Sequence, residues 1–201
     1  MSAAGLILAA GESRRMGTPK ALLEYRGETF LDRLARLFSA RCAPVIVVLG
    51  AHAEQIRARS SAKCAFVFNA GWRTGQTSSM QCGLRAVPAG VDGVLFTLVD
   101  HPAVSEETLD ALVTQAHVRR EHAGPGPALL RVPRFRERRG HPLWFSSALI
   151  PEFLAIPPSG VARDIVRAHA AETEFLDVTD AGILADIDDP AAYRALTGVE
   201  A

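Results

Sequence analysis

Five short apolar runs recur along the chain, separated by polar or amphipathic segments. Runs with apolar residues at nearly every position are typical of strands that are buried on both faces of a sheet. The predicted strands are residues 5–10, 44–49, 65–69, 93–99 and 128–132. Because helical segments alternate with them, the pattern predicts an α/β fold with a largely parallel sheet that is covered on both faces.

The segments between these runs carry helical patterns. In residues 29–41, Phe30, Leu34 and Phe38 recur at helical spacing behind Thr29, which fits an N-cap. The predicted helices are residues 29–41, 53–59, 78–86 and 105 to about 122, the last with Ser105 as its cap and with the glycines and prolines of residues 124–127 beyond its end. In sheets of this kind, ligands bind at the carboxyl ends of the strands.

Composition narrows the class of protein. The 201 residues fit one α/β domain, which we expect to span residues 1–201. The 22 basic side chains balance the 22 acidic ones, so neither nucleic acid nor an anionic membrane is indicated as a partner. No apolar run reaches the roughly 20 residues of a transmembrane helix, and we expect no signal peptide. The scattered cysteines Cys42, Cys64 and Cys82 indicate reduced thiols in a cytoplasmic protein.

The loop after the first predicted strand is the most informative segment. It reads Leu8-Ala9-Ala10-Gly11-Glu12-Ser13-Arg14-Arg15-Met16-Gly17-Thr18-Pro19-Lys20. Its small residues let backbone N–H groups approach phosphates, and its cations neutralise them. It lacks the Gly-Lys-Ser/Thr end of a P-loop and the glycine spacing of a dinucleotide-binding motif. The loop therefore predicts a polyphosphate site of another kind.

Two acidic elements complement this loop. Asp100 opens a D-H-P element directly after the predicted strand 93–99. A carboxylate there is costly unless it is solvated or bound to a cation, and Mg²⁺ prefers one or two carboxylates together with phosphate oxygens. The second element, residues 186–190, reads D-I-D-D-P. In it, Asp189 also fits the N-cap of a short helix with Pro190 at its first position.

The loop resembles the signature L-A-[AG]-G-x-S-x-R-M-G-x-x-K of nucleotidyltransferases with a MobA-like fold, and the acidic elements and residues 69–84 resemble further motifs of that family. The resemblance implies a three-layer (α/β/α) Rossmann-like nucleotidyltransferase fold with a mostly parallel sheet. It implies catalytic roles for Arg15, Lys20 and Asp100. It also implies Mg²⁺ as the cofactor, with Mn²⁺ as the alternative ion, held by Asp100 and Asp188. Many relatives carry Gln or Met in place of His101, so no catalytic role is implied for this histidine.

In that family the opening loop and the segment at residues 69–84 surround the nucleotide. The implied nucleotide-binding residues are Leu8, Ala9, Ala10, Gly11, Ser13, Gly17, Gly75, Ser78 and Ser79. The guanylyl enzymes carry L-A-G-G in the loop, whereas the cytidylyl enzymes carry L-A-A-G, as this chain does. The methyl group of Ala10 narrows the base pocket, which favours a pyrimidine by excluding the larger purine. We therefore expect CTP as the nucleotide.

Arg139, Gly140, His141 and Pro142 form an R-G-H-P element that resembles one on the acceptor side of the site in the molybdenum cofactor subgroup. Together the motifs resemble those of molybdenum cofactor cytidylyltransferases. This implies transfer of CMP from CTP to the terminal phosphate of molybdopterin, release of pyrophosphate, and transient docking to a molybdenum hydroxylase.

Two alternatives stay open. The first is a nucleotidyltransferase that uses another nucleotide (GTP) or another small phosphate acceptor, such as a sugar phosphate. The second is a non-catalytic carrier that binds the molybdenum cofactor for a molybdoenzyme. Retention of Lys20, Asp100 and Asp188 argues against the carrier, because a pure binder has little use for both metal carboxylates.

Overall fold

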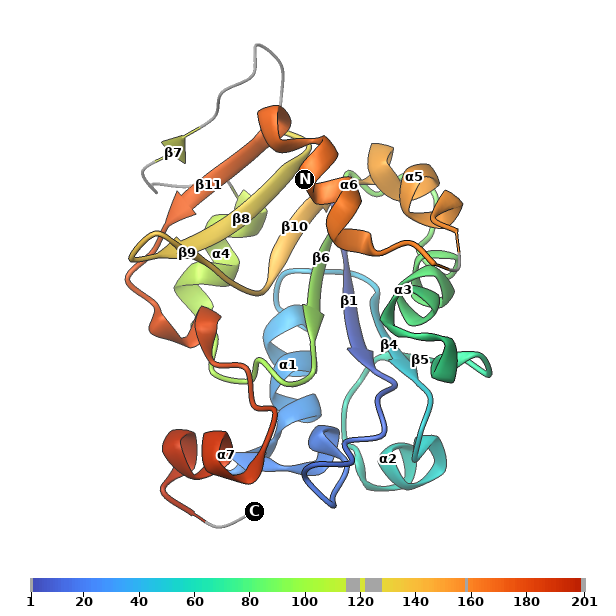
Figure 1. Cartoon of the computed structure of the whole chain (residues 1–201), viewed down its shortest axis with the longest axis vertical. Helices are drawn as coiled ribbons and strands as arrows, with labels where there is room; N and C mark the ends of the chain where they lie inside the picture. Colours follow the sequence, from blue (N-terminus) through green and yellow to red (C-terminus); the bar gives the residue numbers. More distant parts are fainter. Residues whose placement is uncertain (1, 115–119, 122–127, 158, 200–201) are drawn as a thin grey trace.

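In the part of the chain that the structure describes, nine strands form one sheet. The computed structural model describes residues 2–114, 120–121, 128–157 and 159–199 (Figure 1). The strand order across the sheet is β5 (Ala65–Phe68), β4 (Val45–Leu49), β1 (Ala3–Ala9), β6 (Gly93–Leu98), β10 (Leu143–Ser146), β8 (Leu130–Phe135), β11 (Thr173–Asp177) and β7 (Arg120–Glu121), with β9 (Arg138–Arg139) paired to β8. A separate hairpin joins β2 (Glu24–Tyr25) to β3 (Glu28–Thr29).

The strand directions bring the predicted motifs to one edge of the sheet. Strands β5, β4, β1 and β6 are mutually parallel. Strand β10 lies antiparallel between β6 and β8, so β8 and its parallel neighbour β11 point the same way as β6. The carboxyl ends of these six strands therefore share one rim, and the loop after β1 and the D-H-P element after β6 both lie on it. The mostly parallel sheet predicted from the sequence is confirmed.

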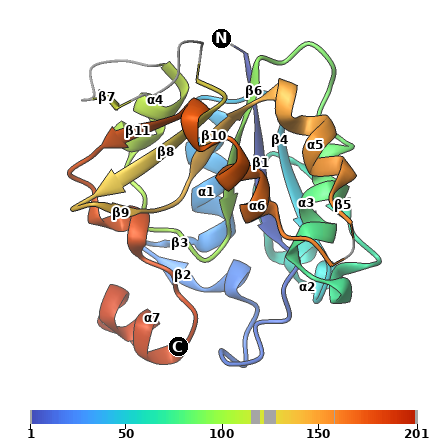
Figure 2. The same cartoon turned by 45° about the horizontal axis from the view of Figure 1, so that its top comes forward.

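Helices cover both faces of the sheet, as Figure 2 shows. They are α1 (Phe30–Ser39), α2 (Ala53–Arg59), α3 (Gln76–Leu84), α4 (Glu106–Thr114), α5 (Ile150–Ala155), α6 (Ala162–Ala168) and α7 (Pro190–Thr197). Ile7 of β1 packs in the core beneath α1 and α4, whereas Leu6 and Leu8 pack beneath α3 and α5. Alternate residues of β1 thus face opposite helical layers, which is the three-layer arrangement predicted.

Most predicted elements form, with bounds shifted by a few residues. Thr29 caps α1 by accepting a hydrogen bond from Asp32 N at 3.1 Å, and Ser105 accepts one from Thr108 N at 3.2 Å at the start of α4. Asp189 caps α7 by accepting a hydrogen bond from Ala192 N at 2.8 Å, and Pro190 opens that helix. The capping residues in the sequence were therefore sufficient to predict where these three helices begin.

The prediction that the helix from Ser105 runs to about His122 is wrong. Helix α4 ends at Thr114, and Arg120–Glu121 form β7, which pairs with the outer side of β11. The free backbone groups of a sheet edge attract another strand, and this long-range pairing is invisible in the local pattern. The predicted end of the helix at residues 122–127 lies outside the described residues.

The structure also shows the state of the cysteines and the character of the helices. All three cysteines are free thiols, as the sequence indicated. In the part of the chain that the structure describes, no helix is both long enough and apolar enough to cross a bilayer.

Candidate active site

The loop after β1 folds back on itself through its own hydrogen bonds. Ser13 adopts a positive φ of 55°, its Oγ accepts a hydrogen bond from Lys20 N at 3.0 Å, and its carbonyl accepts one from Met16 N at 2.9 Å. Gly17 supplies a second left-handed position with a φ of 68°. The buried side chain of Met16 anchors the loop to the core. Held in this way, the loop presents Arg15 and Lys20 to the rim of the sheet.

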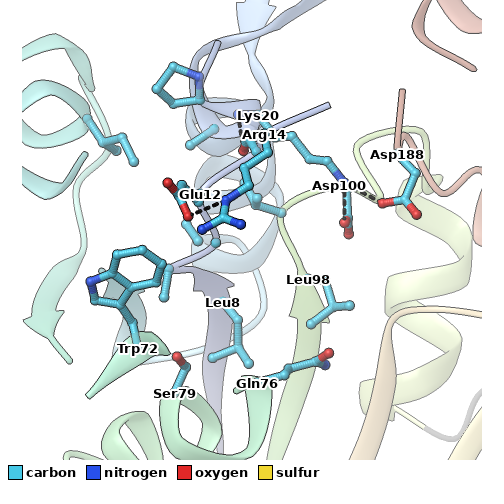
Figure 3. A pocket seen from close by; sticks show the side chains of 18 of the residues that line it. Leu8, Glu12, Arg14, Lys20, Trp72, Gln76, Ser79, Leu98, Asp100 and Asp188 are labelled. Carbon is cyan, nitrogen blue, oxygen red and sulfur yellow. Dashed lines mark hydrogen bonds and ion pairs between the residues drawn. The ribbon is translucent and has the colours of Figure 1, made fainter. Parts of the chain in front are cut away.

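Lys20 joins the two acidic elements. Its Nζ donates to Asp100 Oδ2 at 2.9 Å and to Asp188 Oδ1 at 2.6 Å, and Figure 3 shows these two carboxylates beside each other next to the lysine. Arg15 donates to Asp188 Oδ2 at 2.7 Å. Three segments that are far apart in the sequence therefore meet at one ammonium group. Arg14, by contrast, pairs with Glu12 at 2.7 Å.

The network is balanced in charge. Burial opposes the charge on Lys20, but Asp100 and Asp188 outweigh it and raise the pKa of the ammonium above its usual value. Hydrogen bonds from Lys20 and Arg15 lower the pKa of Asp188. Lys20 and Asp188 are therefore both charged at neutral pH. A triphosphate can compete for the two cations, and a divalent metal for the carboxylates.

A pocket of about 600 Å³ adjoins this network, which is a volume typical of small-ligand sites. Its walls contain most of the predicted nucleotide-binding and catalytic residues: Leu8, Ala9, Ala10, Gly11, Ser13, Arg15, Lys20, Gly75, Ser79, Asp100 and Asp188. Gly17 and Ser78 lie outside these walls, and the contacts of all the predicted residues with a nucleotide stay predictions. In Figure 3, Trp72 and Ser79 lie across the pocket from Asp188. The pocket therefore has a charged end and an end lined by an aromatic ring and a hydroxyl group.

The loop between β5 and α3 forms that second end. The Asn69 side-chain amide donates to Ser78 Oγ and to Ser79 Oγ, each at 3.0 Å. Ser78 also donates to the carbonyl of Gly75 at 2.8 Å, which ties its hydroxyl to the loop. Gly75 has a φ of 121°, a conformation that favours glycine. Ser78 thus shapes the loop, and Ser79 is the serine that faces the pocket.

A second pocket, of about 1150 Å³, opens beside the first, and Gly75 and Gln76 line both. Arg139, Gly140 and His141 of the R-G-H-P element lie in its walls, and their contact with an acceptor stays a prediction. The Arg139 guanidinium stacks over the Phe175 ring with its Cζ 4.4 Å from the ring centroid. Pro142 is buried and lies outside these walls. Two adjoining pockets suit a reaction between two bound molecules.

Backbone packing fixes the histidine of this element. A Cβ on Gly140 would collide with the backbone of Ile183, so only glycine allows this close approach. His141 N in turn donates to Ile183 O at 3.0 Å. The His141 ring stacks on His101 with 4.8 Å between centroids. Burial, together with the neighbouring His101, lowers the pKa of His141 to about 4, so the ring is neutral at physiological pH.

Two further groups near Asp100 were not predicted as site residues. His101 and Asp186 each bring one ligand atom within 4.8 Å of the other and of Asp100. Burial and then the charge of Asp100 raise the pKa of Asp186, whereas burial lowers that of His101. Asp186 is the first acid of the D-I-D element, so its position two residues before Asp188 could have predicted that it lies at the site. The position of His101 beside Asp100 was another.

At this rim a polyphosphate, a metal ion and a second ligand can meet, which is what the reaction of a nucleotidyltransferase requires. The chain belongs to the family described as MobA-like NTP transferase domain, whose sequence model matches residues 5–173.

Curated relatives and a solved structure support this assignment. The chain is 32% identical to the nicotine blue oxidoreductase of Paenarthrobacter nicotinovorans, over 92% of this chain and 91% of that protein. It is 30% identical to the purine catabolism protein PucB of Bacillus subtilis, over 94% and 93%. A shorter match, 38% identical over 50% of this chain and 49% of the relative, is to a protein of Opitutus terrae named "Probable molybdenum cofactor guanylyltransferase". The crystal structure of Rv0371c from Mycobacterium tuberculosis superposes with a TM-score of 0.79 at 27% identity, over 99% of this chain and 100% of that one.

Proposed function

We propose that the protein transfers CMP from CTP to the terminal phosphate of molybdopterin and releases pyrophosphate. The observation that carries this proposal is the position of Lys20, which links Asp100 and Asp188 at the charged end of the nucleotide pocket. Sites of nucleotidyl transfer need cations for the phosphates and carboxylates for a metal in one place. The relative named for molybdenum cofactor guanylyl transfer supports the cofactor as the acceptor.

In the proposed reaction, an oxygen of the acceptor phosphate forms a bond to the α-phosphorus of CTP. The bond between that phosphorus and the bridging oxygen of the β-phosphate breaks, and pyrophosphate leaves with the electron pair. Arg15 and Lys20 exchange their carboxylate partners for phosphate oxygens and stabilise the charge that develops on the leaving group. The acceptor phosphate is already anionic at neutral pH, so no general base is required.

The residues at the rim fit a divalent cation. Asp100 Oδ1 is buried and has no hydrogen-bond partner among the described residues, which is expected of an oxygen that binds a metal ion. Carboxylate oxygens are the donors that Mg²⁺ prefers, and they also bind Mn²⁺. We propose that Asp100 holds the ion and that Asp188, on the other side of Lys20, is the second carboxylate expected from the sequence. The bound ion would neutralise charge on the reacting phosphates.

The choice of CTP rests on Ala10. Its side chain is buried, at 6% exposure, in the apolar core beneath α3, and it also lines the nucleotide pocket. A methyl group fixed by such packing cannot move aside for a larger base. Ser79, with a hydroxyl that faces the pocket, is proposed to bind the base.

The acceptor is proposed to occupy the second pocket, with its terminal phosphate near Gly75 and Gln76, where the pockets meet. Arg139, Gly140 and His141 would contact it, with Pro142 supporting them from the interior. We further propose that residues 1–201 act as one domain in the cytoplasm and that the protein docks transiently to a molybdenum hydroxylase to deliver its product.

Release of pyrophosphate tests the proposal. The protein is incubated with each of the four nucleoside triphosphates, with and without molybdopterin. Release from CTP only when molybdopterin is present is the expected result. Equal turnover of GTP would overturn the nucleotide assignment, and turnover with a sugar phosphate in place of molybdopterin would overturn the acceptor. Tight binding without release from any nucleotide would point to the carrier instead.

A further inference from the structure

We infer that Asp100, His101 and Asp186 form a divalent-cation site whose imidazole ligand makes it prefer a first-row transition-metal ion such as Mn²⁺ to Mg²⁺. The inference rests on the proposed function for its role in the reaction, and it refines the pair of ligands expected from the sequence. In the nucleotide-free protein Asp188 stays with Lys20 and Arg15, and Asp186 is the second carboxylate at the ion. Asp188 can join the ion only after a triphosphate has drawn these two cations away.

The geometry of the three side chains supports this site. One ligand atom from each residue lies within 4.8 Å of the other two. Ligands around a small dication at about 2.1 Å are separated from one another by about 3 Å, so a small contraction closes the cluster on an ion. Asp188, in contrast, has both carboxylate oxygens engaged by cations, Oδ1 by Lys20 and Oδ2 by Arg15.

An unsatisfied carboxylate oxygen and an imidazole nitrogen face each other at this place. Lys20 occupies Asp100 Oδ2, whereas Asp100 Oδ1 is buried with no hydrogen-bond partner among the described residues. His101 is only 6% exposed, and the ring nitrogen that faces Asp100 Oδ1 is Nε2. His101 Nε2 lies 3.8 Å from Asp100 Oδ1, which is too far for a hydrogen bond. A cation between these groups would satisfy the oxygen and an imidazole nitrogen together.

The surroundings hold the ligands in position. Ile187 N donates to the carbonyl of Asp100 at 3.0 Å, which fastens the D-I-D element to the D-H-P element. Ile187 itself is buried, so the acids on either side of it face the rim. The His141 ring, 4.8 Å from that of His101 by centroids, limits rotation of the histidine. Groups that orient metal ligands in this way sharpen affinity and selectivity.

The donor set decides which ion is favoured. Mg²⁺ binds oxygen ligands and water in proteins and gains little from imidazole. First-row transition-metal ions accept imidazole together with carboxylates, and their affinities rise along the series that begins with Mn²⁺. A site of two carboxylates and one imidazole therefore discriminates against Mg²⁺.

Pulsed electron paramagnetic resonance of the nucleotide-free protein titrated with Mn²⁺ tests the site, because a directly bound imidazole adds a nitrogen coupling to the manganese spectrum. The expected result is a tightly bound ion with this coupling, which Mg²⁺ displaces only at about tenfold or higher excess. His101→Gln should remove the coupling, weaken Mn²⁺ binding about tenfold or more, and narrow the preference over Mg²⁺. Asp186→Asn should weaken binding similarly.

Two matched variants serve as controls. Asp188→Asn removes the other acid of the same element, and His169→Gln removes a histidine that pairs with Glu152 outside the site. Both should keep the nitrogen coupling and bind Mn²⁺ within about threefold of the unaltered protein, and circular dichroism should show that every variant is folded. Bound Mn²⁺ without nitrogen coupling, or loss of binding in Asp188→Asn but not in Asp186→Asn, would overturn the inference. Nitrogen coupling in a protein that turns over no nucleotide would uphold the metal site and overturn only the proposed function.

Discussion

The ammonium of Lys20 lies 2.9 Å from Asp100 Oδ2 and 2.6 Å from Asp188 Oδ1, so one side chain of the opening loop holds both acidic elements. In a complex with a metal ion and a triphosphate, each charged group of this network can bind a more highly charged ligand instead of its present partner. The carboxylates can exchange the lysine for a dication, and the lysine can exchange the carboxylates for phosphate. The ion pairs therefore keep the site assembled without blocking it.

Replacement of this lysine is the first prediction. In Lys20→Met, we expect kcat/KM to fall by about 10²–10³-fold, because a preorganised cation that faces the leaving group is lost. Lys63, the only other lysine in the chain, is exposed, and Lys63→Met is the matched control. Steady-state release of pyrophosphate measures the effect. Near-normal activity in Lys20→Met would show that the cation takes no part in the reaction.

The second prediction concerns the nucleotide. Ala10→Gly removes the methyl group proposed to exclude purines, so the ratio of kcat/KM for CTP to that for GTP should fall by about tenfold or more. Ala4→Gly removes a buried methyl group of β1, the strand that Ala10 directly follows, and Ala4 lies outside the pocket walls, so this variant should leave the ratio unchanged. Competition assays with both nucleotides give the ratio directly. An unaltered ratio in Ala10→Gly would show that the selectivity for the nucleotide does not come from the methyl group of Ala10.

The third prediction separates the two pockets. Arg139 lines the larger pocket, whereas the adjacent Arg138 does not. Arg139→Ala should raise KM for the acceptor about tenfold, as expected from the loss of one charge-assisted contact, and should leave KM for CTP unchanged. Arg138→Ala should alter neither value. If Arg139→Ala raised KM for CTP instead, the two substrates would have to be exchanged between the pockets.

The fourth prediction concerns stability and pH. The pKa of His141 is lowered to about 4 by burial and by His101, whereas a histidine in an unfolded chain titrates near pH ~6.5. Between these pH values His141 is protonated in the unfolded chain but neutral in the folded protein. The contribution of His141 to the free energy of unfolding is thus complete above pH ~6.5, and roughly 2–3 kcal/mol of it is lost as the pH falls towards ~4.

Urea unfolding of the protein between these pH values measures the effect. His141→Gln should flatten this part of the curve, and His169→Gln, at a partly exposed histidine, should retain more of it. An unchanged slope in His141→Gln would mean that folding does not alter the pKa of this ring.

The sequence predicted the parts of the site that lie on local motifs at the ends of buried strands. The apolar runs located β1 and β6, and the rule that parallel strands end at one rim brought Lys20 and Asp100 together. Asp188 joined them through the resemblance of its D-I-D element to a family motif, since no periodicity links that segment to the sheet.

The features that escaped prediction depend on contacts between distant segments. Strand β10 is short, and it takes its place in the sheet by antiparallel pairing with both β6 and β8. The approach of Asp186 to His101 depends on the hydrogen bond from Ile187 N to Asp100 O. The junction of the two pockets at Gly75 depends on how the loop before α3 closes. None of these leaves a periodic signal in the sequence.

The most direct test of the proposed function follows the transferred group itself. The protein is incubated with CTP labelled at the α-phosphorus, molybdopterin and Mg²⁺ or Mn²⁺, and the products are separated and identified by mass spectrometry. We predict that the label appears covalently attached to molybdopterin as a cytidylyl group, in amounts equal to the pyrophosphate released. Label that stays in CTP or appears only as free CMP, or equal transfer from GTP, would contradict the assignment.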